Sequence, residues 1–243
     1  MPGPQDMQEM GDRFQEMVDE FFGLQCRYQA AIRLVTAKLE TLDDEFQAQH
    51  SRNPIHSMQS RMKTIRSMME KLERNHLEIS IGSAVENLYD IAGVRVICSY
   101  IQDIYTVYDL LSRQDDIHIL RVRDYIRQPK ANGYRSMHLV VEVPVYLAEG
   151  RVNVPVEIQI RTIAMDFWAS LDHSLRYKTP EAIPPDIGAE LLEVATDIAA
   201  LDERMQQVHD KVEQQFGKTQ DRYRLHREIL AQKRKETGKE KLP

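Results

Sequence analysis

Cysteines and long apolar stretches are scarce in this 243-residue sequence. The two cysteines, Cys26 and Cys98, lie far apart, and Cys98 belongs to the apolar run 94–98. We therefore expect both thiols to be reduced, as in cytosolic proteins, with no disulfide between them. No apolar run approaches the ~20 residues of a transmembrane helix, and the first residues lack the apolar core of a signal peptide. These absences predict a soluble cytoplasmic protein.

Several motifs that mark nucleotide and metal sites are also missing. Neither G-x-x-x-x-G-K-[ST] nor G-x-G-x-x-G occurs, so a loop of backbone amides that cradles phosphate is not indicated. The spacing of cysteine and histidine offers no zinc site, and no Ser–His–Asp or Cys–His arrangement is evident. The net charge of -6 does not favour nucleic-acid binding, which a local basic cluster would have to support.

Apolar periodicity predicts long helices at both ends of the chain and strands in the middle. An apolar stripe from Tyr28 to Phe46 marks a long helix that starts near Asp12, is interrupted near Gly23 and ends before Pro54. Further helices are expected over 64–75, 83–88, 104–111 and 162–176, and strands over 94–98, 117–127, 136–147 and 152–161, with 55–63 as a strand or an extended arm. Four or five strands joined by hairpins and a helical crossover predict an α+β domain flanked by helical ends.

The C-terminal helix carries the most regular pattern. From Ile187 to Val212, apolar residues repeat at spacings of four and three for about seven turns. A stripe this regular needs another helix to cover it, either the long N-terminal helix or a helix of a second subunit, and the two alternatives are compatible. The tail from Lys218 is rich in Lys and Arg and is expected to be frayed at its end.

The segment from Val152 to Arg161 alternates strictly between apolar and polar residues. Valine and isoleucine occupy the even positions, whereas Glu157, Gln159 and Arg161 occupy odd ones. Because successive side chains of a strand point to opposite faces, these three polar groups share one face. The polar loop 128–138 beside them supplies lysine, arginine and tyrosine. Together the two segments predict the floor of a site for phosphates and a base.

Each candidate functional residue also has a plainer interpretation. Asp90 precedes one strand and Glu157 lies in another; together they could hold a Mg²⁺ that bridges nucleotide phosphates, but each alone is more often a surface or ion-pair carboxylate. Tyr134 either stacks on a base or is a partly buried turn aromatic. His138 is more often a structural histidine than a ligand. The basic residues at 61–74 and 121–127 are also compatible with a solvated helix face and a charged edge strand.

Five short segments occur in order through the middle of the chain. They are Arg61-x-Lys63-x-x-x-Ser67-x-x-x-Lys71, Asp90-Ile-Ala-Gly93-Val-Arg95, Lys130-x-Asn132-Gly133-Tyr134-Arg135-Ser136-x-His138, Glu157-Ile-Gln159-Ile-Arg161-Thr162 and His173-x-x-x-Tyr177-Lys178. Jointly they resemble the Rel/Spo-type (p)ppGpp synthetase domain, and the chain looks like a small alarmone synthetase of the RelP type. The resemblance implies a nucleotidyltransferase-like mixed sheet of about five strands in a catalytic domain at 51–178. It also implies helical extensions at 1–50 and 179–243, and no segment matches the hydrolase domain of long Rel enzymes.

The resemblance further implies an activity and a set of roles. Such enzymes transfer the pyrophosphoryl group of ATP to the 3′-hydroxyl of GTP or GDP and release AMP. By position in the motifs, Asp90 and Glu157 bind Mg²⁺, and Glu157 also takes the hydroxyl proton. ATP would be held by Arg61, Lys63, Ser67, Lys71, Arg95 and Arg123, with Arg61 and Arg123 on either side of adenine. The acceptor nucleotide would contact Lys130, Asn132, Tyr134, Arg135 and His138, with Tyr134 stacked on guanine and Gln159 and Arg161 in supporting roles. The helical ends would build a homo-oligomer, which in this family is generally a tetramer.

Two other functions compete with this hypothesis. One is a nucleotidyltransferase-like enzyme with the same pair of carboxylates and different substrates. The other is a single-stranded RNA-binding module that uses the basic face and Tyr134. The overall negative charge weighs against RNA, and a purely structural role would leave the pattern from Arg121 to Arg161 unexplained.

Overall fold

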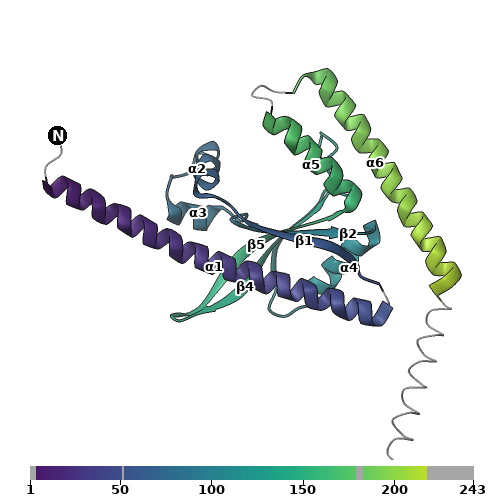
Figure 1. Ribbon diagram of the computed structural model, residues 1–243, viewed down its shortest axis with the longest axis horizontal. Helices are drawn as coiled ribbons and strands as arrows, with labels where there is room; N and C mark the ends of the chain where they lie inside the picture. Colours follow the sequence, from purple (N-terminus) through teal and green to yellow (C-terminus); the bar gives the residue numbers. More distant parts are fainter. Residues whose placement is uncertain (1–3, 51, 179–182, 218–243) are drawn as a thin grey trace, which may run out of the picture. The chain divides into compact units, whose positions relative to one another are not determined.

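The computed structural model describes residues 4–50, 52–178 and 183–217. Its elements, in chain order, are α1 (Pro4–His50), β1 (Ile55–Met62), α2 (Ile65–Arg74), α3 (Ile81–Asn87), β2 (Ala92–Cys98), α4 (Ile101–Ser112), β3 (His118–Asp124), β4 (Met137–Leu147), β5 (Gly150–Thr162), α5 (Ile163–Lys178), α6 (Pro185–Val212) and a π-helical turn (Glu213–Gly217) (Figure 1). The predicted α+β class is confirmed. Among the described residues, no helix is long and apolar enough to cross a membrane.

The five strands form one mixed sheet in the order β1-β2-β5-β4-β3. Strands β2 and β5 pair in parallel, and the other three pairs are antiparallel. Because directly opposed residues of paired strands lie on the same face, the pairing defines rows of side chains across the sheet. One row runs Arg61–Gly93–Glu157–Val140–Arg121, and the next runs Gln59–Arg95–Gln159–His138–Arg123. The sheet thus gathers polar groups from segments that are far apart in sequence.

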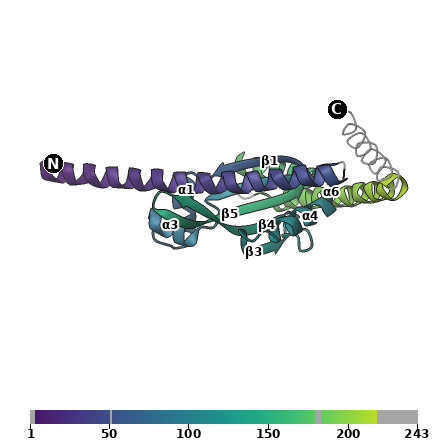
Figure 2. The ribbon, with the colours of Figure 1, turned by 90° about the horizontal axis from the view of Figure 1, so that it is seen from below.

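The other face of the sheet is buried against helices. Helix α1 packs on β2, β4 and β5 and also contacts α4 (Figures 1 and 2). Its residues Leu24, Val35 and Leu39 are fully buried together with Val156 and Ile158 of β5. Burying an aliphatic side chain of this size contributes roughly 1.5–3 kcal/mol, so α1 stabilises the sheet that carries the polar rows. It is part of the core as well as an extension of the chain.

Helix α1 is longer and more regular than expected. The prediction of an interruption near Gly23 is wrong, because the helix runs through this residue without a break. A glycine costs a helix only about 1 kcal/mol. Buried Leu24 and Tyr28 lie in the next turn, and burial against the core offsets that cost. The side chain of Arg27 also donates to the carbonyl oxygen of Gly23.

Two other boundaries differ from the sequence-based expectation. Residues 55–62 form the edge strand β1, which resolves the alternative between a strand and an arm. The arginine-bearing strand β3 ends at Asp124, not at Arg127. The Asp124 carboxylate accepts hydrogen bonds from the backbone N–H groups of Ile126 and Arg127, which turns the chain away from the sheet. The basic tail from Lys218 lies outside the described residues.

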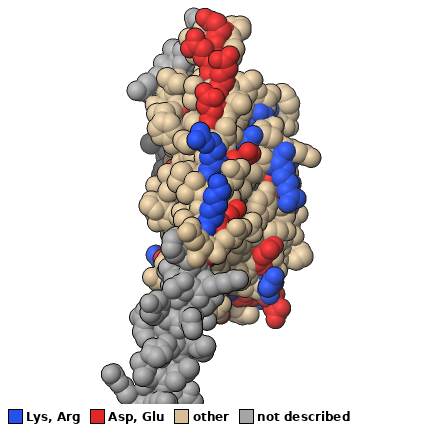
Figure 3. Space-filling view, turned by 90° about the vertical axis from the view of Figure 1, so that its right-hand side faces the viewer, with Lys and Arg blue, Asp and Glu red and all other residues tan. Residues whose placement is uncertain are grey.

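The described residues up to Ala199 form one compact unit, and those from Ala200 form a second. The apolar stripe of α6 is exposed in the single chain. Its members Ile187, Val194, Leu201, Met205, Val208 and Val212 are each roughly half exposed. On the face that Figure 3 draws, Lys and Arg side chains are separated by acidic and neutral ones and form no continuous basic surface.

Candidate active site

The polar face of β5 is the floor of the site. Glu157 and Gln159 are half-buried on this face, while Val156, Ile158 and Ile160 are buried beneath it. The predicted alternation along this strand is therefore confirmed. Arg161 continues the polar series but is only 5% exposed, so its charge has to be compensated by protein groups.

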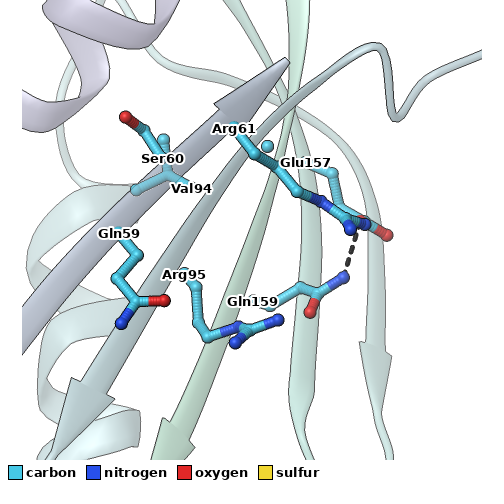
Figure 4. A pocket seen from close by; sticks show the side chains of 8 residues that line it. Gln59, Ser60, Arg61, Val94, Arg95, Glu157 and Gln159 are labelled. Atoms are coloured by element: carbon cyan, nitrogen blue, oxygen red, sulfur yellow. Dashed lines mark hydrogen bonds between the residues drawn. The ribbon is translucent and has the colours of Figure 1, made fainter. Parts of the chain in front are cut away.

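Two cavities open on this floor. The smaller one, of about 80 Å³, lies between β1, β2 and β5 and is lined by Gln59, Ser60, Arg61, Gly93, Val94, Arg95, Glu157 and Gln159. Figure 4 shows the side chains of Arg61, Arg95, Glu157 and Gln159 directed into one space. The larger one, of about 830 Å³, is lined by Arg61, Arg95, Lys130, Asn132, Tyr134, Gln159 and Arg161, and by Ala169, Ser170, Asp172 and His173 of α5. A cavity of that size holds a small-molecule ligand such as a nucleotide. Because Arg61, Arg95 and Gln159 line both, the cavities are neighbouring parts of one site.

A closed ring of hydrogen bonds surrounds Glu157. Its Oε2 accepts from Nε2 of Gln159 at 2.7 Å, and its Oε1 lies 3.2 Å from Nδ1 of His138. His138 Nε2 lies 2.7 Å from the Tyr134 hydroxyl, which accepts from Nη2 of Arg161 at 2.6 Å. The same Nη2 donates to Oε1 of Gln159 at 2.7 Å, which closes the ring. The ring fixes the carboxylate on one side and leaves its other side for a ligand.

This ring also sets the ionisation of Glu157. Burial by itself would raise the pKa of the Glu157 carboxyl, and the negative charge of Asp90 acts in the same direction. The hydrogen bonds from His138 and Gln159 outweigh both and hold the pKa below its usual value. Glu157 is therefore an ionised carboxylate at neutral pH.

Asp90 lies between two lysines at the start of β2. Its Oδ2 binds Nζ of Lys63 at 2.6 Å and Nζ of Lys71 at 2.7 Å. Burial would raise the pKa of Asp90, but the hydrogen bonds and charges of the two lysines outweigh it and lower the pKa. Three residues further on, Gly93 pairs with Glu157, so the two carboxylates face neighbouring parts of the floor. The two carboxylates are close enough for the charge of Asp90 to act on the pKa of Glu157.

The second carboxylate oxygen of Asp90 fits a cation ligand. Oδ1 is buried and has no hydrogen-bond partner, which is costly for a charged oxygen unless a ligand occupies it. Among the described residues, no three acidic, histidine or cysteine side chains cluster as a complete metal site. Mg²⁺ requires no such cluster, since it is usually bound by one or two carboxylates together with water and substrate phosphates. Asp90 and Glu157 supply two carboxylates of that kind.

The loop 130–134 carries the aromatic wall of the larger cavity. The Tyr134 ring lies 4.7 Å from Nζ of Lys130 and 5.1 Å from the guanidinium carbon of Arg161. A turn closed by a hydrogen bond from Gly133 N to Lys130 O shapes the loop, and Asn132 Nδ2 lies 3.5 Å from the Asp172 carboxylate. Two cations lie over the ring and the hydroxyl is hydrogen-bonded, so the Tyr134 side chain is held in a fixed position beside the cavity.

Gly133 packs this loop against α6. Its φ is +85°, and a Cβ atom here would overlap the Cβ of Ala195 and lie 3.2 Å from Cδ1 of Leu192. Nearby, the indole N–H of Trp168 on α5 donates to the carbonyl oxygen of Leu191. Glycine is required at 133 because its backbone conformation and its close approach to α6 both exclude a side chain.

We expect Gly133→Ala to reduce the free energy of unfolding by about 1–3 kcal/mol and to displace Tyr134. Chemical denaturation measures the first effect, and the affinity for a guanine nucleotide measures the second. Gly188→Ala is a matched control, because nothing lies within 4 Å of a Cβ at that position. Equal behaviour of the two variants would contradict this account of the loop.

The structure does not bring all of the predicted residues together. Arg61 and Arg95 lie in one cavity, but Arg123 is on β3, at the edge of the sheet opposite β1. Four strand spacings of about 4.8 Å put the two backbones roughly 19 Å apart. Arg123 lines neither cavity, and Arg95 is the guanidinium next to Arg61, so the placement of Arg61 and Arg123 on either side of one ring stays a prediction.

Some residues lie beside the cavities, and others were missed. Ser67 is exposed in the first turn of α2, where its N–H is capped by Thr64, and neither Ser67 nor Arg135 lines a cavity described above. Sequence reasoning missed Gln59, Asp166 and Asp172, and it gave no role to His173, which opens the fifth motif. Gln59 could have been found, since it is two residues before Arg61 on the same strand face. No sequence pattern marks Asp166, because its partners Arg95 and Arg161 lie on two other elements, β2 and β5.

Comparisons with known proteins agree with this site. Residues 60–182 match the family described as "Region found in RelA / SpoT proteins". The chain is 44% identical to the GTP pyrophosphokinase YwaC of Bacillus subtilis over 186 residues, which cover 76% of this chain and 89% of that protein. It is 35% identical to the GTP pyrophosphokinase YjbM of the same organism over 77% of this chain and 87% of that protein.

A solved structure shares the same fold. Small alarmone synthetase 1 of Bacillus subtilis, bound to its product pppGpp, matches with a TM-score of 0.73 and 34% identity, over 79% of this chain and 97% of that one. The family match includes every residue that lines the two cavities except Gln59, and the likeness extends over most of the chain. The chain therefore belongs to the RelA/SpoT family, in which it is similar to the small alarmone synthetases.

Proposed function

We propose that this protein is a GTP pyrophosphokinase, which transfers the pyrophosphoryl group of ATP to the 3′-hydroxyl of GTP or GDP and releases AMP. The observation that carries the proposal is the position of Glu157, an ionised carboxylate that lines the smaller cavity and accepts a hydrogen bond from Gln159, which lines both cavities. Two substrates that react with each other need two such neighbouring sites. The activity printed for the relatives and the pppGpp in the related structure support the same reaction.

In this proposal the smaller cavity and its basic surroundings receive ATP. Arg61 and Arg95 are planar cations beside the cavity and are suited to adenine or phosphate. Lys63 and Lys71 form ion pairs with Asp90 near this cavity, and their charges can neutralise phosphate. Ser67 of α2 is a further contact for the phosphates. Arg123 lines neither cavity, and its assignment to ATP rests on its motif alone.

The larger cavity receives the acceptor nucleotide. Tyr134 offers a π-face for guanine, and Lys130 and Asn132 line the same wall. His138 holds Tyr134 and Glu157 at the same time, and Gln159 and Arg161 complete the ring around the carboxylate. Arg135 follows Tyr134 and is assigned to the acceptor side on the strength of its motif alone.

The chemical step is a displacement at the β-phosphorus of ATP. Glu157 takes the proton of the 3′-hydroxyl, and the oxygen forms a bond to the β-phosphorus. The bond between that phosphorus and the oxygen shared with the α-phosphate breaks, and AMP leaves with that oxygen. Asp90 and Glu157 would hold Mg²⁺, which when bound neutralises charge on the phosphates. The remaining side chains mainly position the two nucleotides.

A product assay tests the proposal directly. The protein is incubated with ATP, Mg²⁺ and either GTP or GDP, and the nucleotides are separated by anion exchange. We expect equal amounts of AMP and of a guanosine penta- or tetraphosphate. AMP without such a product, or transfer to a different acceptor, would favour another nucleotidyltransferase activity.

Both cavities lie within 51–178, which supports this range as the catalytic domain and 1–50 and 179–243 as helical extensions.

We further propose that subunits associate through the exposed apolar stripe of α6, and that the protein is a homotetramer in the cytoplasm. Apolar residues at a strict seven-residue spacing, including Val194, Leu201 and Val208, are typical of helices that pair.

We expect the double substitution Leu201→Glu and Val208→Glu to reduce the assembly to smaller species, because charge cannot be buried between paired helices. Sedimentation or light scattering gives the mass, against 28.3 kDa for one chain. Gln207→Glu adds charge on the same helix at an exposed polar position and serves as the control. Wild-type protein that is monomeric at micromolar concentration would refute the assembly.

A further inference from the structure

Asp166 lies in the first turn of α5 and binds two arginines of the sheet at once. Its Oδ1 is 3.1 Å from Nη1 of Arg161 on β5 and 3.4 Å from Nη1 of Arg95 on β2. The carboxylate is about three-quarters buried, with 23% of its side chain exposed. Helix α5 thus supplies one negative charge to two cations that come from different strands.

The two arginines repel each other without this carboxylate. Burial lowers the pKa of Arg95, the positive charge of Arg161 lowers it further, and Asp166 acts in the opposite direction. Arg161 is 5% exposed, so water screens it little. In the described part of the chain its other recorded partners are the neutral groups of Ser136, Gln159 and Tyr134.

Arg161 fixes the direction of the hydrogen bonds that reach Glu157. A guanidinium can only donate, so the Tyr134 hydroxyl accepts from Arg161 and has its own proton left for Nε2 of His138. In a neutral imidazole the ring proton of His138 is then on Nδ1, the nitrogen that faces Glu157. Every bond in this series points from Arg161 towards Glu157. Asp166 holds the first member of the series in place.

The geometry points to Asp166 as a positioning residue that serves both substrate subsites. Through Arg95 it orients the wall of the smaller cavity, and through Arg161 it orients Tyr134 and the ring around Glu157. The inference rests on the proposed function, because it assigns the two cavities to the two nucleotides. Asp166 lines neither cavity, so in this proposal it acts through the two guanidinium groups.

Asp166→Asn removes the charge and keeps the shape of the side chain. We expect the KM for ATP and the KM for the guanine acceptor each to rise by about tenfold or more, since each arginine loses its ion pair with the carboxylate. The change in kcat should be smaller than the change in either KM. A purely structural role would instead reduce the amount of active enzyme and leave both KM values unchanged.

Two further variants separate positioning from helix stability. Asp186→Asn removes an exposed acidic side chain from the first turn of α6, so it controls for the effect of a charge at a helix N-terminus. It should leave both KM values at the wild-type level. Asp166→Glu retains a carboxylate and should recover part of the lost affinity for both nucleotides.

Initial rates over a grid of ATP and acceptor concentrations give both constants. Titration of each variant with a non-hydrolysable ATP analogue and with GDP, separately, gives the affinities without turnover. If Asp166→Asn leaves both affinities unchanged, or alters only one of them, the inference is overturned. If the wild-type protein binds both nucleotides and makes no product, the proposed function fails and the binding data still decide the role of Asp166.

Discussion

Glu157→Gln is expected to lower kcat by about 10³-fold while the protein remains folded. The removal of a general base alone costs roughly 10²–10⁴-fold, and this variant also loses one charge from the site for Mg²⁺. Glutamine can still accept the hydrogen bond from His138 through its oxygen, so one of the two contacts of the carboxylate survives. Rates of AMP release under saturating nucleotide measure the effect, and thermal unfolding reports on the fold.

Glu142→Gln is the matched control for this experiment. Glu142 lies on β4, opposite Pro155 and away from both cavities. It should retain wild-type rates, since the loss of a negative charge elsewhere on the sheet does not affect the base. The same pair of variants tests the RNA-binding alternative. If the protein were an RNA-binding module, Glu157→Gln would keep or increase the affinity for a single-stranded oligonucleotide, and wild type would release no AMP.

The strand β5 was predictable because its side-chain pattern has a local physical cause. A strand that covers a core on one face must alternate, so Glu157, Gln159 and Arg161 could be assigned to one face without knowing their neighbours. Four of the five strands were predicted from their own apolar patterns, and 55–63 was left open between a strand and an extended arm. The mixed sheet of about five strands was predicted from the resemblance to the family. The site on this face follows from those local patterns and from the motifs that resemble the family.

Contacts between elements could not be predicted from local patterns. Strand order decides that β2 lies beside β5 and that β3 lies at the far edge, and no periodicity within a strand encodes it. The separation of Arg123 from Arg61 across the sheet could not be predicted for this reason, because an arginine in a basic strand looks the same at either edge of a sheet. Asp166 was missed for the same reason. Its role is visible only when the first turn of α5 is placed over β2 and β5.

Asp90→Asn is expected to reduce activity by about 10²–10³-fold and to raise the Mg²⁺ concentration needed for half-maximal rate. A metal ion contributes several kcal/mol to transition-state stabilisation, and each ~1.4 kcal/mol is a factor of ten in rate. An amide is a poorer ligand than a carboxylate for Mg²⁺. It also leaves Lys63 and Lys71 without the charge that now holds both ammonium groups. Mg²⁺ titrations of the initial rate, with Asp109→Asn on the exposed side of α4 as control, measure both effects.

The same substitution has a stability effect with a defined dependence on pH. The pKa of Asp90 is lower in the folded protein than its usual value of about 4, so the ionised group stabilises the fold above that pH and the contribution is lost as pH falls through the folded pKa. Urea unfolding at pH 7 should therefore show Asp90→Asn to be about 1 kcal/mol less stable than wild type, and the difference should shrink below pH 4. A difference that stays constant from pH 7 to pH 3 would mean that the two lysines do not stabilise the ionised form of Asp90. The carboxylate would then be held in place by backbone geometry alone, and its lowered pKa could no longer be attributed to the lysine pair.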